Sequence, residues 1–128
     1  MFLRFSKKFL STMTDPLKCK WEEVTKTTEV LIMTCSGYEP RAAIAAFDMD
    51  GTIITTKSGR VFPTHINDWK LQYDDRVAQT IQKYHGDGFK VVIFTNQNGI
   101  ASGKMSKSDF KQKIQAIVQR LNVPLQLY

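Results

Sequence analysis

The chain has 128 residues, of which 42% are hydrophobic and 23% are charged. That length suits one ordinary globular domain, and no apolar run is long enough to span a membrane, so we expect no membrane association. The formal net charge of +6 favours an anionic partner without naming one. Cys19 and Cys35 form no metal-binding pattern, and we expect them to be buried, reduced thiols of an intracellular protein.

Residues 1–15 have the composition of a terminal tail or a targeting segment. Three basic side chains stand among serines and threonines, and no acid occurs before Asp15. A mitochondrial presequence, a flexible tail and a stretch upstream of a true start at Met13 all fit this composition. The globular domain is therefore placed at residues 16–128.

Residues 30–34 form a β-branched and apolar segment, which is expected either to pair as an extra strand or to pack under the main sheet. Trp21 precedes it and is expected to pack in the core rather than to bind a ligand.

Residues 41–52 read RAAIAAFDMDGT, a run of small and apolar residues that ends in two acids and a glycine. This pattern predicts a buried parallel strand whose carboxyl end opens onto a loop, where α/β sheets bind ligands. In an extended segment Asp48 and Asp50 point the same way. They are either a polar strand end before a glycine turn, or a divalent-metal site in which one aspartate attacks and the other moves protons.

Residues 53–63 predict a hairpin with strands at 53–56 and 60–62, whose tip would place Lys57 and Arg60 to meet phosphate. A helix is expected from about residue 74 to residue 85, where glycines end it.

Residues 90–94 are a second apolar strand, which stops in Thr95 and Asn96. The β-α-β order predicts parallel pairing with the first strand, so both strands end at one edge of the sheet. The Thr95 hydroxyl and the following backbone N–H groups would then lie beside Asp48, where they could hold a phosphoryl oxygen. The glycines before Lys104 do not have the spacing of a P-loop, and we reject a Walker motif.

A capping box of Ser106 and Asp109 predicts a helix that continues through Leu121. Its outer face is expected to carry the helix's basic side chains, Lys107, Lys111, Lys113 and Arg120. Residues 96–128 hold five basic side chains against one acid, which fits a solvated face or a track for a polyanion. Residues 123–128 predict a third strand.

Three stretches carry a resemblance to a known family: FDMDGTIITTKSGRVFPTHINDW, FKVVIFTNQNGIASGK, and the last helix with VPLQLY. Together they resemble the phosphatase part of the polynucleotide kinase 3′-phosphatase family, DNA-repair enzymes of the haloacid dehalogenase superfamily. The resemblance implies an α/β fold of the Rossmann-like, three-layer haloacid dehalogenase type. The 128 residues would be its N-terminal part, incomplete at the C-terminus.

The resemblance also implies roles for individual residues. Asp48 matches the nucleophile, whose carboxylate shares Mg²⁺ with the main-chain carbonyl of Asp50, and Asp50 matches the general acid and base. Thr95 and Asn96 match the phosphate-holding motif. Lys57, Arg60 and Lys104 are the expected nucleic-acid contacts, although relatives often carry arginine where Ser102 stands.

The family's charge-neutralising lysine and further acids have no match in these residues. We therefore expect the chain by itself to have little phosphatase activity and to leave a sheet edge unpaired at residues 125–128.

The expected partners are DNA with 3′-phosphate ends and DNA-repair scaffold proteins. The protein would be a monomer in the nucleus. The composition of residues 1–15 leaves the mitochondrion as an alternative location. Two alternatives remain: a small-metabolite phosphatase of the histidinol-phosphate type, and a catalytically dead nucleic-acid-binding fragment.

Overall fold

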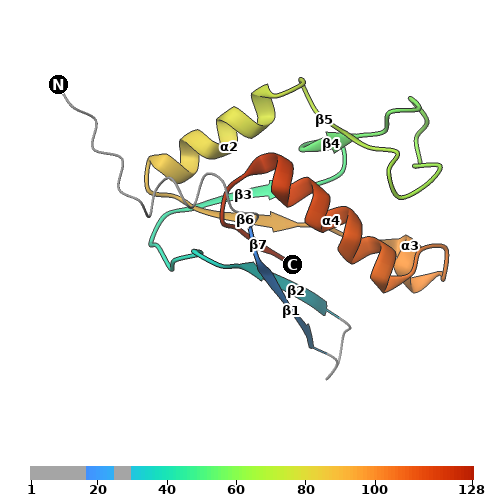
Figure 1. The fold of residues 1–128 in the computed structure, drawn as a ribbon, viewed down its shortest axis with the longest axis horizontal. Coiled ribbons are helices and arrows are strands. Elements are labelled where there is room, and N and C mark those ends of the chain that lie inside the picture. The colour runs from blue at the N-terminus through green and yellow to red at the C-terminus, as the bar shows by residue number, and fades with distance from the viewer. Residues whose placement is uncertain (1–16, 25–29) are drawn as a thin grey trace.

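The computed structural model describes residues 17–24 and 30–128, so the expected tail at residues 1–15 lies outside the described residues. A five-stranded sheet has the order β1-β2-β7-β6-β3, and a two-stranded sheet joins β4 and β5 (Figure 1). The strands are β1 Cys19–Val24, β2 Val30–Cys35, β3 Ile44–Asp48, β4 Ile54–Thr55, β5 Lys70–Leu71, β6 Lys90–Phe94 and β7 Gln126–Leu127. The helices are α2 Arg76–Gly86, α3 Asn98–Ala101 and α4 Lys107–Leu121. The described helices include none that could span a membrane.

The parallel half of the sheet confirms the predicted α/β class. β3 pairs parallel with β6, from Ile44 opposite Lys90 to Asp48 opposite Phe94, and β6 pairs parallel with β7. The two strands therefore end together, and the residues that follow each strand meet at one edge of the sheet.

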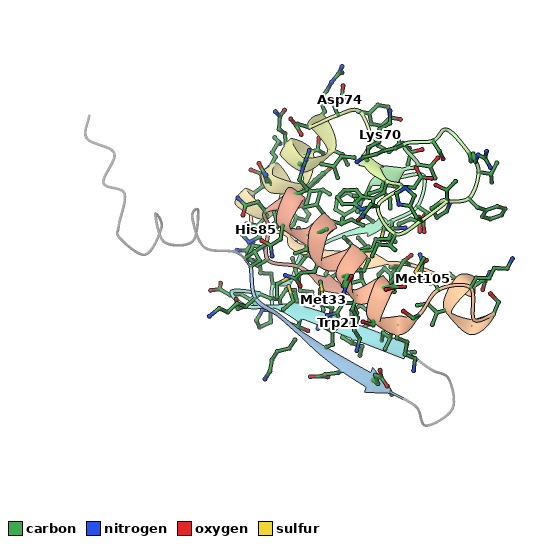
Figure 2. All side chains as sticks on the ribbon, turned by 45° about the vertical axis from the view of Figure 1, so that its right-hand side comes forward. Trp21, Met33, Lys70, Asp74, His85 and Met105 are labelled. Atoms are coloured by element: carbon green, nitrogen blue, oxygen red, sulfur yellow. The ribbon has the colours of Figure 1, made fainter. Side chains whose placement is uncertain are left out.

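The antiparallel half confirms the extra strand and corrects the expected open edge. β2 pairs with β7 on one side and with β1 on the other. Because β2 covers β7, the prediction of an unpaired edge at residues 125–128 is wrong. β1 was not predicted. Trp21 on β1 packs edge-on against Phe110 of α4 with ring centroids 6.3 Å apart, as the core expectation requires (Figure 2).

One face of the parallel strands packs against both long helices. Val91 and Ile93 of β6 belong to the same buried cluster as Ile81 of α2 and Ile114 of α4. On the opposite face Ile44 is 53% exposed and Phe94 is 52% exposed. The expectation that β3 is a fully buried strand is thus wrong for this face, since no described helix covers it. A third layer remains a prediction.

The two long helices lie close to their predicted ranges. In α4 the Ser106 hydroxyl accepts a hydrogen bond from the Asp109 N–H at 3.0 Å, which confirms the cap. Lys113 contradicts its expected place on the outer face, because its residue is only 4% exposed. It lies three residues after Phe110 and four before Ile117, so all three share the buried side of the helix.

The hairpin predicted over residues 53–62 is wrong. β4 pairs with β5, which places Ile54 opposite Leu71, and residues 56–69 form a long loop between the two strands. Two internal contacts shape the loop: Thr56 donates to the Arg60 carbonyl at 2.6 Å, and Asp68 accepts hydrogen bonds from Ser58 and Thr64.

Candidate active site

A tight turn at the end of β3 presents the two predicted aspartates. Asp48 and Asp50 are exposed, while Met49 between them is fully buried. The Met49 carbonyl accepts hydrogen bonds from three successive N–H groups, those of residues 52–54. Gly51 has a φ of +78°, a left-handed conformation that favours glycine. The chain therefore reverses directly after Asp50, and the two carboxylates remain on the open side of the turn.

Gln97 joins this turn to the end of β6. Its side-chain Nε2 donates to Asp50 Oδ2 at 2.8 Å and to the Thr95 hydroxyl at 2.7 Å. Sequence reasoning missed Gln97, although it follows Thr95 and Asn96 in the same strand-end segment. The Thr95 backbone N–H donates to the Tyr128 carbonyl at 2.9 Å. The hydroxyl is therefore the Thr95 group that could still donate to a phosphoryl oxygen. Asn96 is exposed beside it, and its phosphate contact remains a prediction.

A hollow of about 800 Å³ opens beside Asp50. Three cations from separate segments line it: Arg60 of the long loop, Lys104 before α4, and Lys113 of α4. Met105, labelled in Figure 2, marks its α4 side. Lys57 is exposed, and it is not among the described residues that line the hollow. The structure thus brings two of the three predicted nucleic-acid contacts to the acid turn.

A second hollow, of about 320 Å³, lies between the strand-end segment and β2. Thr95, Asn96 and Lys107 line it together with Leu31. Among the described lining residues of the two hollows, Asp48 appears in neither. Asp48 is instead exposed at the strand end, on the open side of the turn.

Asp68 fixes the long loop from within. It is 3% exposed, and its carboxylate accepts the Ser58 N–H at 2.8 Å, the Ser58 hydroxyl at 2.7 Å, the Thr64 N–H at 2.9 Å and the Thr64 hydroxyl at 3.1 Å. The Ser58 hydroxyl and then the Thr64 N–H hold the pKa of this carboxyl well below its usual range. Sequence reasoning missed Asp68. The loop that it closes presents Val61 and Phe62, which are 88% and 80% exposed.

The oxygen donors at the turn suit a hard divalent cation. Magnesium is usually bound through one or two carboxylates and completes its shell with water and phosphate oxygens. Asp48 and Asp50 offer carboxylates of that kind. Within residues 17–24 and 30–128 no group of three or more His, Cys, Asp or Glu side chains could hold a metal ion. By donor chemistry the two aspartates are compatible with Mg²⁺, and they would be only part of its ligand set.

Paired carboxylates at the carboxyl edge of a parallel sheet, next to a hollow lined by cations, define an α/β domain suited to an anionic ligand. The family model described as polynucleotide kinase 3 phosphatase matches residues 43–128, and the chain belongs to this family.

Three relatives illustrate the similarity. A bifunctional polynucleotide phosphatase/kinase of Schizosaccharomyces pombe is 42% identical over 83 residues, which are 65% of this chain and 20% of the relative. A polynucleotide 3′-phosphatase of Arabidopsis thaliana is 29% identical over 113 residues, 85% of this chain and 15% of the relative. A probable D-glycero-D-manno-heptose-1,7-bisphosphate 7-phosphatase of Thermoplasma acidophilum is 34% identical over 74 residues, 58% of this chain and 43% of the relative. The chain spans less than half the length of each.

Proposed function

We propose that the chain forms part of a Mg²⁺-dependent polynucleotide 3′-phosphatase that removes 3′-phosphate groups at DNA strand breaks. The observation that carries the proposal is the junction of Asp50, Gln97 and Thr95, which ties the acid turn to the phosphate-holding segment in a member of this family. The three-layer haloacid dehalogenase fold, DNA-repair scaffold partners, a monomeric state and a nuclear or mitochondrial location belong to the same proposal.

The reaction would use the two aspartates in turn. An Asp48 carboxylate oxygen attacks phosphorus, the bond from phosphorus to the sugar O3′ breaks, and Asp50 donates its proton to that oxygen. Asp50 then takes a proton from a water molecule, whose oxygen attacks the aspartyl-phosphate and releases inorganic phosphate. Gln97 orients Asp50 throughout by its 2.8 Å hydrogen bond. Thr95 and Asn96 would hold phosphoryl oxygens.

The metal has a limited place in this scheme. Asp48 and the main-chain carbonyl of Asp50 would hold Mg²⁺, whose charge offsets the repulsion between a carboxylate and a phosphate dianion.

The hollow supports nucleic acid as the substrate class. Arg60, Lys104 and Lys113 supply positive charge for the phosphates that neighbour the 3′ end. Phe62 offers an exposed aromatic ring, the kind of surface on which unpaired bases stack. Lys57, outside the hollow, would meet the backbone farther from the reacting phosphate.

The test is phosphate release by a chimera in which residues 1–128 continue into the remaining phosphatase part of the S. pombe relative. The substrates are an oligonucleotide with a 3′-phosphate, the same oligonucleotide with a 5′-phosphate, and histidinol phosphate. We expect turnover of the first to exceed the others by about a hundredfold or more, because removing one preorganised contact typically costs that much. Equal turnover of the 3′- and 5′-phosphorylated strands would reject the proposal.

A small-metabolite phosphatase is the second candidate, favoured by the similarity to the heptose-bisphosphate phosphatase. A salt titration of oligonucleotide binding separates it from a nucleic-acid role, since only a polyanion-binding site should show a steep slope. Steep binding by a chimera without turnover would instead favour a non-catalytic nucleic-acid-binding protein.

A further inference from the structure

The two cysteines meet across the β1–β2 pair. Cys19 begins β1, Cys35 ends β2, and the two residues are direct partners in the antiparallel register. Their Sγ atoms lie 2.8 Å apart, and both thiols are free. The expectation of buried, reduced thiols did not include this contact, which arises because the strands pair residues sixteen positions apart.

The backbone around the pair has the geometry that a disulfide needs. The Cys35 N–H donates to the Leu125 carbonyl at 3.0 Å, on the side away from β1, and the Ser36 N–H donates to the Lys18 carbonyl. Cys19 and Cys35 are therefore a non-hydrogen-bonded pair, in which opposite Cα atoms approach to about 4.5 Å. That separation falls within the usual disulfide range of about 4.4–6.8 Å, so little backbone movement is required.

The surroundings of the thiols favour reaction with each other. Cys35 is 2% exposed and Cys19 is half-buried, so a small oxidant has better access than a bulky thiol. The hydrogen bond between the two thiols lowers the pKa of Cys35 and raises the pKa of Cys19. A thiol of lowered pKa beside a second thiol is the arrangement of a reacting and a resolving cysteine.

We propose that Cys19 and Cys35 form a reversible oxidation site, which closes to an intramolecular disulfide when the protein meets hydrogen peroxide. The thiolate attacks one peroxide oxygen, the O–O bond breaks, and hydroxide leaves and takes a proton to become water. The second thiol then attacks the sulfenic sulfur, the S–S bond forms, and a second water leaves. Two thiols are oxidised, one peroxide is reduced, and an external dithiol reverses the reaction.

The disulfide would fasten the outer strand to the rest of the sheet. It would join the first residue of β1 to the last residue of β2, at the end of the strand pair away from the β1–β2 connection. The Glu23 carboxylate on β1 lies 3.7 Å from the Nζ atoms of both Lys107 and Lys111 of α4, so the same strand also contacts the helix. Oxidation should therefore stabilise the packing of β1 against β2 and α4.

The test uses the full chain, treated with hydrogen peroxide, then unfolded and labelled with N-ethylmaleimide so that the label also reaches the buried Cys35. Reduced protein should take two labels, and oxidised protein should take none and lose about 2 Da, with a Cys19–Cys35 linked peptide in the digest. The Tm of the oxidised form should rise by about 10 °C and return after dithiothreitol. Cys19→Ser is the matched control, because it keeps the buried Cys35 and should show neither the mass loss nor the Tm shift.

Two results would overturn the proposal. One is that both thiols still take label at a peroxide concentration that oxidises the methionines, and the other is that the digest contains only intermolecular links. Should Cys19→Ser fail to fold, the mass and digest of the unaltered chain still decide. The site is independent of the phosphatase proposal, since neither thiol lines the hollow beside Asp50.

Discussion

Lys113 offers a prediction in which stability and binding move in opposite directions. Its residue is 4% exposed, it lines the hollow beside Asp50, and within the described chain it forms no hydrogen bond or ion pair. A lysine at so buried a position loses hydration without gaining a partner, which opposes folding, whereas methionine has a similar length and no charge. Lys113→Met should therefore raise the free energy of unfolding by about 1 kcal/mol, which corresponds to a Tm higher by about 4 °C.

Binding should change the other way. If the Lys113 ammonium meets a phosphate in the hollow, its loss should cost about 1–2 kcal/mol, or about 5- to 30-fold in Kd. The slope of log affinity against log salt should also fall by about 0.7, the value for one contact to a single strand. Fluorescence anisotropy with a labelled, 3′-phosphorylated single strand measures both quantities, and a thermal scan gives the Tm.

Lys83→Met is the matched control, because the Lys83 side chain is 78% exposed on α2 and, among residues 17–24 and 30–128, pairs with Asp87 alone. It should alter Tm and affinity little, as exposed ion pairs contribute little. A Lys113→Met protein that is less stable and binds DNA unchanged would refute the reasoning, since Lys113 would then serve the fold alone.

Three further predictions concern the acid turn and the long loop. In a chimera with full activity, Asp48→Asn should abolish both turnover and the phospho-enzyme, whereas Asp50→Asn should slow both steps; full-rate turnover by Asp48→Asn, measured as phosphate release, would end the assignment. Asp68→Ala should open the long loop, which trypsin cleavage at Arg60 would detect. Because the pKa of Asp68 is lowered in the folded state, the carboxylate should stabilise the fold fully above about pH 4. That contribution should be lost as the pH falls below this value. Arg60→Ala should raise Kd for the oligonucleotide more than Lys57→Ala, because Arg60 alone of the two lines the hollow, and equal losses would contradict that placement.

The features that sequence reasoning predicted well are local. β3 and β6 each follow from an apolar run that stops in polar residues, and α4 follows from its Ser106 cap. Pairing between adjacent strands then follows from the order of the elements, so the meeting of Asp48 with the Thr95 segment was predictable.

The features it missed depend on partners distant in the sequence. β4 and β5 are each two residues long, and Asp68 closes the loop between them from within. No local sequence pattern therefore distinguishes the β4–β5 pair from a hairpin over residues 53–62. The contact between Cys19 and Cys35 likewise required the strand register. Lys113 is the exception, because its spacing from Phe110 and Ile117 already placed it on the buried face.

Acidic side chains from other elements lie next to several of the basic side chains of the C-terminal region, so a count of basic residues overstates its positive charge. Lys107 and Lys111 lie 3.7 Å from Glu23, and Arg120 lies 3.5 Å from Asp75, so acids from β1 and from the start of α2 partly neutralise the exposed side of α4. These partly exposed pairs contribute little stability, but they reduce the field available to a polyanion there.

Three further cations gather at the hollow beside Asp50: Arg60, Lys104 and Lys113. They come from the long loop, the segment before α4 and the buried side of α4, and they face a turn whose two carboxylates would repel a phosphate dianion. An aspartyl nucleophile requires such compensation, because attack brings two anions together. In the proposed function, the basic character of the chain would therefore act mainly through the three cations of the hollow, and less through the outer surface of α4.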